Sequence, residues 1–305
     1  MKNKERFGGI IPPLVTPLLP DETLDVVTTK QLIEYLIQNN VNGIFVNGTS
    51  GEAMRVTESV WEGITRLALE TVNGRVPVFC GAIDTSTLRV IERIRRIEAM
   101  GGELVVCTPP FYLKSFGQDE ILRHYDKICS SVSKNIQIAV YNIPSTTGAN
   151  IEPETIAKLA DYDNIVAYKD SCADFEQVQH DLFQLADKDI CMFNGAEDLC
   201  AASMLFGAQG CIPGLANFYP ELFVRLYQLC RKGEVAESVR LQEQISEIRK
   251  CLHVGTSWMA VMKYLLKREG FGHDTVSSPI PPLNDEHRRS IDAILERAGV
   301  SRRER

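Results

Sequence analysis

The chain has 305 residues, of which 44% are hydrophobic, and can therefore bury a large core as one big domain or as one domain with an appendage. Its net charge of −7, without any run of Lys and Arg, argues against nucleic acid and an anionic membrane surface as partners. The charged N-terminal residues lead directly into an apolar segment, so no signal peptide is visible and we expect a cytoplasmic protein.

Short apolar runs rich in β-branched residues recur along the chain, and an amphipathic helical stretch follows each of them. We expect strands at residues 9–16, 43–47, 78–82, 104–108, 138–142, 165–169, 191–194 and 210–213. The runs are nearly continuous rather than alternating, which is typical of parallel strands whose outer face is covered by helices. Helix starts are marked by Thr57, by Asp84 or Thr85, and by Pro153 and Pro220, as N-cap residues and as two prolines in a first turn.

Eight strand–helix alternations within about 230 residues predict a closed (β/α)8 barrel, the TIM barrel fold of the α/β class. A doubly wound open sheet is the competing fold, but it usually carries a glycine fingerprint after its first strand, whereas here Gly9 leads into prolines. The alternation stops after Gly233, and three helices are expected at 234–252, 256–268 and 283–298. We therefore expect a barrel domain at residues 1–233 and a C-terminal three-helix appendage at residues 234–305, packed on the barrel or on a neighbouring subunit.

The sequence carries no clear signature of a membrane span, a metal site or a bound cofactor. The uncharged stretch 199–220 is long enough to cross a bilayer, but its glycines and polar residues suit a helix, a strand and a loop better. The nine cysteines are scattered without a Cys-x-x-Cys pair and have mostly apolar neighbours, so we expect reduced, buried thiols. The five histidines lack the spacing of zinc ligands, and no glycine-rich phosphate loop is visible. We therefore expect neither a metal nor an organic cofactor.

The carboxyl ends of the strands, where the active sites of such barrels lie, carry three groups with complementary chemistry. Lys169 ends an apolar strand, and burial disfavours the charged form of an amine, which makes it a usable nucleophile near neutral pH. A salt bridge with Asp170 or with another acid is the structural alternative for this lysine. Tyr141 ends the preceding strand, and the turn after the second strand carries the hydroxyls of Thr49 and Ser50. An amine, a phenol and a hydroxyl turn suited to a carboxylate predict a Schiff base with a 2-oxo acid, in which the iminium is the electron sink.

The other candidates at the strand ends also have structural interpretations. The turn at residues 48–51 would then only join a strand to its helix, and Tyr141 would bond a backbone carbonyl at the barrel mouth. Glu197 and Asp198 would form the acidic first turn of a helix, and Tyr112 would cover a loop. The coincidence of all these residues at strand ends favours a functional site.

Three segments resemble the class I aldolase family that includes dihydrodipicolinate synthase and N-acetylneuraminate lyase. They are Gly-Thr-Ser-Gly-Glu at 48–52, Tyr-Asn-Ile-Pro-Ser-Thr-Thr-Gly at 141–148 and Lys-Asp-Ser at 169–171. Their order and spacing also fit, and the resemblance covers nearly the whole chain, including the helical tail. It implies a (β/α)8 barrel that assembles as a homotetramer of tight dimers.

The resemblance also implies roles for individual residues. Lys169 would form the Schiff base with pyruvate or another 2-oxo acid, and Tyr141 would relay protons. Thr49 and Ser50 would hold the carboxylate of pyruvate and complete the relay. Tyr112 best matches the tyrosine that enters the site from the tight-dimer partner in the synthases.

Thr146 departs from the pattern of the synthases, which carry an arginine there that is thought to bind the carboxylate of aspartate semialdehyde. A threonine can donate one neutral hydrogen bond but cannot make a charged, bidentate contact. The loss of such a contact typically costs about 2 to 5 kcal/mol. Thr146 therefore argues against aspartate semialdehyde as the aldehyde substrate.

Other segments look more like the enzymes that act on sugar acids. Gly195, Glu197 and Asp198 lie in a segment that resembles the sugar-binding acidic segment of neuraminate lyase, and carboxylates can accept several hydroxyl donors. The segment 212–217, which begins with Ile212, also resembles the sugar-acid aldolases. We therefore expect an aldolase that cleaves or forms a 2-keto-3-deoxy sugar acid, with pyruvate and an aldehyde as its partners. Dihydrodipicolinate synthase, a dehydratase of the family and a non-catalytic 2-oxo acid sensor are the alternatives, although a sensor should have lost the lysine or the tyrosine.

Overall fold

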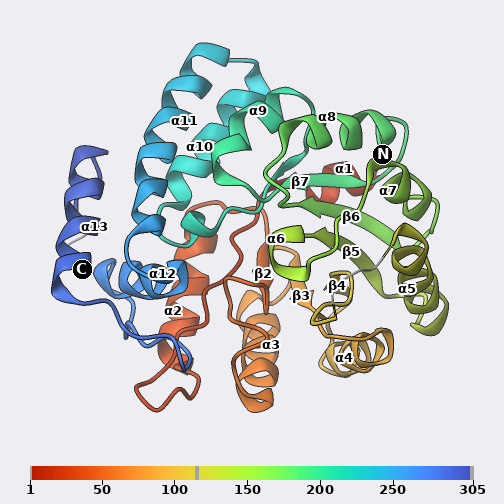
Figure 1. The fold of residues 1–305 in the computed structure, drawn as a ribbon, viewed down its shortest axis with the longest axis horizontal. Coiled ribbons are helices and arrows are strands. Elements are labelled where there is room, and N and C mark those ends of the chain that lie inside the picture. The colour runs from red at the N-terminus through yellow and green to blue at the C-terminus, as the bar shows by residue number, and fades with distance from the viewer. Residues whose placement is uncertain (1, 114–116, 303–305) are drawn as a thin grey trace.

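The computed structural model describes residues 2–113 and 117–302 and shows one parallel eight-stranded sheet (Figure 1). The strand order is β1-β8-β7-β6-β5-β4-β3-β2. The strands are β1 (Gly9–Ile10), β2 (Ile44–Val46), β3 (Val78–Gly81), β4 (Leu104–Cys107), β5 (Gln137–Asn142), β6 (Ile165–Asp170), β7 (Cys191–Asn194) and β8 (Gly210–Cys211). A parallel bridge between Pro13 and Phe45 joins the segment after β1 to β2. The sheet therefore curls on itself, and the expected TIM barrel fold is confirmed.

The first and last strands are shorter than expected, while the other six begin and end within one residue of the expected bounds. The segment that was expected as a strand at 9–16 contains Pro12 and Pro13, and the one at 210–213 ends in Pro213. Proline has no backbone N–H to donate to a neighbouring strand, so regular pairing stops before it.

Helices cover the outer face of the sheet and build the C-terminal region. They are α1 (Lys2–Phe7), α2 (Val26–Gln38), α3 (Glu58–Val72), α4 (Thr87–Ala99), α5 (Gln118–Ser131), α6 (Pro144–Thr147), α7 (Pro153–Leu159), α8 (Phe175–Gln184), α9 (Cys200–Leu205), α10 (Pro220–Lys232), α11 (Val235–Arg249), α12 (Trp258–Arg268) and α13 (Asp285–Arg297), with 3-10 turns η1 (Glu197–Leu199), η2 (Gly214–Asn217) and η3 (Lys250–His253). Thr57 caps α3, and Pro153 and Pro220 open α7 and α10, as predicted. The helix start expected at Asp84 or Thr85 is wrong by one or two residues, because Ser86 is the N-cap of α4. The short helices α1 and α6 were not expected, because neither is long enough to show a helical period.

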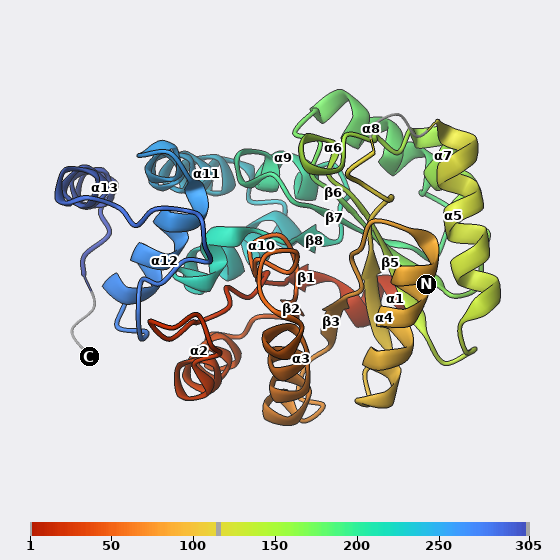
Figure 2. The same ribbon diagram turned by 60° about the horizontal axis from the view of Figure 1, so that its bottom comes forward.

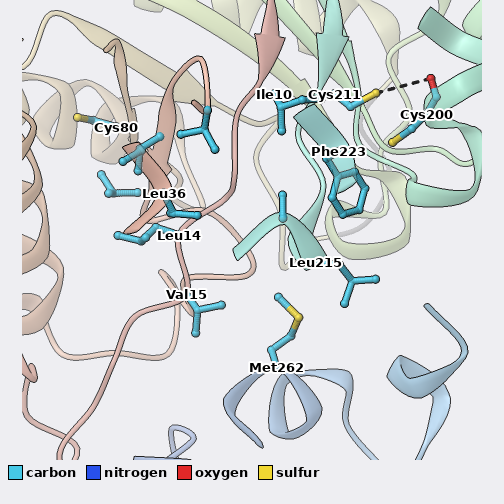
Figure 3. Close-up of a cluster of buried hydrophobic side chains, with 14 of the residues drawn as sticks. Ile10, Leu14, Val15, Leu36, Cys80, Cys200, Cys211, Leu215, Phe223 and Met262 are labelled. Carbon is cyan, nitrogen blue, oxygen red and sulfur yellow. Dashed lines mark hydrogen bonds between the residues drawn. The ribbon is translucent and has the colours of Figure 1, made fainter. Parts of the chain in front are cut away.

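The strands bury side chains on both faces. Inside the barrel the rings of Phe79 and Phe193 meet edge to face, with centroids 6.0 Å apart. Between the sheet and the helices lies a larger cluster, in which Figure 3 shows Ile10 near Phe223. This burial on both faces is the physical reason for the nearly continuous apolar runs in the sequence. All nine cysteines are free and seven are buried, which agrees with the expected reduced thiols.

The helices α11, α12 and α13 lie together at one side of the barrel, away from α5 and α7 (Figures 1 and 2). Met262 of α12 belongs to the same buried cluster as Leu215 of the barrel (Figure 3). Asp292 of α13 accepts hydrogen bonds from Tyr264 Oη and Arg268 Nε of α12, both at 2.8 Å. The three expected helices are therefore present and pack on the barrel, while a domain boundary at residue 233 stays a prediction.

Among the described residues, no helix is both long enough and apolar enough to cross a membrane.

Candidate active site

The register of the central strands brings Lys169 and Tyr141 together. Tyr141 of β5 is paired with Lys169 of β6, and paired residues of neighbouring parallel strands point to the same face. Lys169 Nζ lies 4.2 Å from the centroid of the Tyr141 ring and 5.5 Å from that of Phe45. The two residues are 5% and 2% exposed, so the amine faces the phenol in a site largely shielded from water.

Asp170 does not neutralise Lys169, so the structural alternative of a salt bridge between them is wrong. Successive side chains of a strand point to opposite faces, and the Asp170 carboxylate lies on the other side of β6. It accepts hydrogen bonds from Asn142 Nδ2 and from the Cys172 thiol, both at 2.8 Å. Burial raises the pKa of Asp170, although these two hydrogen bonds partly offset the rise.

A cavity of about 300 Å³ opens at the carboxyl ends of the strands, as expected for this fold. Eight of the predicted site residues line it, namely Lys169, Tyr141, Thr49, Ser50, Thr146, Gly195, Glu197 and Ile212. Residues from all along the barrel, 49 to 212, therefore converge on one hollow.

Gly195 is needed at its position because the Lys169 side chain passes directly over it. A Cβ at Gly195 would lie 2.7 Å from Lys169 Cε and 2.0 Å from Ser171 Oγ, which is closer than non-bonded atoms approach. Ser171 also lines the cavity. The absence of a side chain at Gly195 therefore leaves the space in which the amine lies.

Glu197, rather than Asp198, is the acidic residue of the cavity wall. Its Oε1 accepts the backbone N–H of Leu215 at 2.9 Å, and its Oε2 lies 3.3 Å from Arg249 Nε. Burial raises the pKa of Glu197, while the Leu215 N–H and the Arg249 guanidinium counteract that rise. Asp198 is half exposed, binds Arg249 Nη1 at 2.9 Å and does not line the cavity. The side chain of Asp198 therefore points away from the cavity, and a contact of Asp198 with substrate stays a prediction.

Tyr112 lies outside the cavity of its own chain. It is 87% exposed, and its φ of 82° places it in the left-handed region that residues with a Cβ seldom adopt. Tyr112 therefore does not line the cavity of its own chain in this structure. Its entry into the site of a partner subunit stays a prediction.

The C-terminal appendage supplies a wall of the cavity that the sequence did not reveal. Arg249, His253, Trp258 and Met262 line the cavity together with Leu252. They lie on or beside the helices of the appendage, and only tertiary packing brings these helices to the carboxyl ends of the strands. The appendage is thus part of the site and not merely a covering layer.

In residues 2–113 and 117–302, no group of three or more His, Cys, Asp and Glu side chains is arranged to hold a metal ion.

Comparison with known proteins agrees with this geometry. The model of the dihydrodipicolinate synthetase family matches residues 6–298. A 4-hydroxy-tetrahydrodipicolinate synthase of Pelobacter propionicus is 31% identical over 294 residues, which are 96% of this chain and 99% of the relative. A protein of Escherichia coli K12 named probable 2-dehydro-3-deoxy-D-pentonate aldolase is 28% identical over 303 residues. The match covers 97% of this chain and 99% of the relative.

A solved structure shows the same fold over nearly the whole length. It is YagE, a prophage protein of the dihydrodipicolinic acid synthase family from Escherichia coli K12, in complex with pyruvate. Its TM-score is 0.91 at 27% identity, and the match covers 97% of this chain and 99% of YagE. The chain therefore belongs to the dihydrodipicolinate synthetase family and is a lyase of the class I aldolase type.

Proposed function

We propose that this enzyme is a pyruvate-dependent aldolase that cleaves or forms a 2-keto-3-deoxy sugar acid through a Schiff base on Lys169. The observation that carries the proposal is the buried Lys169 amine, which faces the Tyr141 ring at 4.2 Å in a cavity that Thr49 and Ser50 also line. YagE was solved in complex with pyruvate, which supports pyruvate as the 2-oxo acid.

The reaction in the cleavage direction uses only groups of this cavity. Lys169 Nζ attacks the C2 ketone, and loss of water gives the iminium. Tyr141 gives its proton to the departing water, and the phenolate then removes the proton of the C4 hydroxyl. The C3–C4 bond breaks, and the electron pair of this bond moves into the iminium to form an enamine. The aldehyde leaves, a proton returns to C3, and water hydrolyses the iminium to release pyruvate and the free amine. Thr49 and Ser50 hold the carboxylate and complete the proton relay.

The charges at the far end of the cavity favour a hydroxylated, uncharged aldehyde. The Arg249 guanidinium is already shared between Glu197 and Asp198, so this region has no surplus positive charge for a second carboxylate. The Glu197 carboxylate can accept hydroxyl donors from a polyol. Thr146, which also lines the cavity, adds a neutral hydroxyl and no cation.

A synthase that condenses pyruvate with aspartate semialdehyde is the second candidate. The observation that favours it is Arg249, a cation that lines the same cavity. It would have to exchange its contact with Glu197 for the carboxylate of the aldehyde. The synthase of Pelobacter propionicus, at 31% identity, supports this alternative as a relative.

The proposal is tested by incubating the enzyme with pyruvate and borohydride. We expect a reduced pyruvyl group on Lys169 in a peptide map by mass spectrometry, and no label in Lys169→Ala. A label that survives Lys169→Ala, or an unlabelled native enzyme, contradicts the proposal. A panel of aldehydes assayed with pyruvate then distinguishes the two candidate substrates.

A further inference from the structure

A buried ion pair with the C-terminal appendage holds the turn that carries Thr49 and Ser50. Glu52 closes this turn, and Lys263 lies on α12. Lys263 Nζ is 2.7 Å from Glu52 Oε1, and the two side chains are 1% and 0% exposed. A salt bridge between a barrel loop and an appendage helix therefore lies wholly inside the protein.

Both charged groups make their remaining hydrogen bonds close to the turn. Lys263 Nζ also donates to the carbonyl oxygen of Thr16, whose own hydroxyl donates to the Gly51 carbonyl at 2.6 Å. Glu52 Oε2 accepts the backbone N–H of Ser277 at 2.8 Å and also its hydroxyl. The turn is thus fixed at Gly51 and Glu52, to the first barrel segment on one side and to the appendage on the other.

The backbone of the turn depends on these contacts. Glu52 has a φ of 57°, in the left-handed region that residues with a Cβ avoid. At Gly51 a Cβ would lie 2.9 Å from the Leu14 carbonyl oxygen, so only glycine fits. Side-chain contacts rather than local preference therefore set the path of the chain just after Ser50.

The pair also lies next to the cavity. Met262, the neighbour of Lys263, lines the cavity together with Ser50. A Cβ at Gly214 would lie 3.2 Å from Met262 Cε and 3.6 Å from Ser50 Oγ. The helix that carries the lysine and the turn that carries the hydroxyls therefore approach the same point.

We propose that Glu52 and Lys263 are positioning residues that hold the Thr49 and Ser50 hydroxyls in the orientation that binds the carboxylate of the 2-oxo acid. The inference rests on the proposed function, because it takes pyruvate as the ligand of the turn. A buried ion pair adds little net stability, since desolvation offsets the attraction of the charges. Its effect is to select one conformation of the turn.

Two substitutions and a matched control test this inference. Lys263→Met removes the ammonium but keeps an unbranched chain, and Glu52→Gln keeps the shape of the carboxylate. Arg268→Met is the control, since Arg268 is a buried cation on the same helix that pairs with Glu269 and Asp292 and does not line the cavity. The measurements are the half-saturating pyruvate concentration in borohydride trapping, the KM for the aldehyde and the melting temperature.

Lys263→Met and Glu52→Gln should each raise the half-saturating pyruvate concentration at least about tenfold, because the hydroxyls are no longer held in place. The KM for the aldehyde should stay within about twofold, since the aldehyde binds elsewhere in the cavity. The half-saturating pyruvate concentration of the double variant should not exceed that of the weaker-binding single variant, because both substitutions break the same interaction. Arg268→Met should lower the melting temperature and leave pyruvate binding unchanged.

If Lys263→Met does not fold, the Glu52→Gln/Lys263→Met double variant gives the same measurement, because it buries no unpaired charge. Folded variants that bind pyruvate like the native enzyme show that the pair is only structural, and this outcome overturns the inference alone. A native enzyme that traps no pyruvate overturns the proposed function as well, so the two failures are distinguishable.

Discussion

Lys169 passes so close to Gly195 that a Cβ on the glycine would lie 2.7 Å from the lysine Cε. The same Cβ would lie 2.0 Å from Ser171 Oγ. A methyl group at this position must therefore displace the lysine, the serine or both. The geometry of the amine thus depends on a residue of the neighbouring strand end that has no reactive group of its own.

Gly195→Ala should slow borohydride trapping of pyruvate at least about tenfold, because a displacement of about 1 Å at a reacting group costs that much or more. Gly63→Ala is the matched control. Gly63 lies in α3, and its new Cβ would meet only the flexible Leu24 side chain, at 3.2 Å. Equal trapping rates for Gly195→Ala and the native enzyme would show that the site accommodates the methyl group and that this contact is unimportant.

The part of the site that lies on strands could be predicted from the sequence, and the part that lies on the appendage could not. Lys169 and Tyr141 were found because apolar runs locate strand ends, and a parallel barrel brings those ends together. Arg249 and Lys263 lie on amphipathic helices whose docking depends on tertiary packing, which leaves no local pattern. The sequence could not show that Glu197 rather than Asp198 lines the cavity, because adjacent residues of a helical turn diverge in direction and no local pattern marks the one that faces inward.

Asp181 of α8 should make the stability of the enzyme depend on pH. It is fully buried, and burial together with the nearby charge of Asp170 raises its pKa from 3.8 to about 8. The folded state therefore holds a proton that the unfolded state has lost between about pH 4 and pH 8, so the free energy of unfolding falls as the pH rises through this window. Above pH 8 both states are ionised and the loss is complete.

Asp181→Asn should remove this dependence, because an amide stays neutral at every pH. We expect its melting temperature to exceed that of the native enzyme by at least about 2 °C at pH 9 and to converge toward it as the pH falls to 5. Asp187→Asn is the control, since Asp187 is an exposed acid shortly after the same helix. If the melting temperatures of Asp181→Asn and the native enzyme differ by the same amount at every pH, Asp181 is ionised in the folded state.

Tyr112, at 87% exposure, should act in the site of a partner subunit. Tyr112→Phe and Lys169→Ala should each lose most of their activity, but a refolded mixture of the two should recover it. In a mixed dimer, the subunit with an intact Lys169 receives Tyr112 from its partner, so about a quarter of the native activity should return on statistical grounds.

The control for this experiment is a mixture of Lys169→Ala with Tyr141→Phe. Both of these residues line the cavity of one chain, so no arrangement of the mixed subunits restores a complete site. If the first mixture recovers no more activity than the control, Tyr112 does not act across a subunit interface.

The choice of aldehyde should follow from Thr146 and Glu197, which line the same cavity as Lys169. The native enzyme should use glyceraldehyde with a higher kcat/KM than aspartate semialdehyde. Thr146→Arg adds a bidentate cation and should shift the ratio of the two kcat/KM values toward aspartate semialdehyde by at least about tenfold.

Glu197→Gln should lower kcat/KM for glyceraldehyde at least about tenfold, because the amide replaces one carboxylate acceptor by a donor and loses the charge that strengthens hydroxyl contacts. Trapping of pyruvate on Lys169 should remain, since the pyruvate end of the cavity is unchanged. Asp198→Asn is the matched control, because Asp198 binds the same Arg249 from outside the cavity. This variant should leave kcat/KM for glyceraldehyde within about twofold of the native value.

A native preference for aspartate semialdehyde would instead show that Arg249 takes the place of the missing arginine. In that case Arg249→Met should abolish the preference, and the synthase would be the correct function.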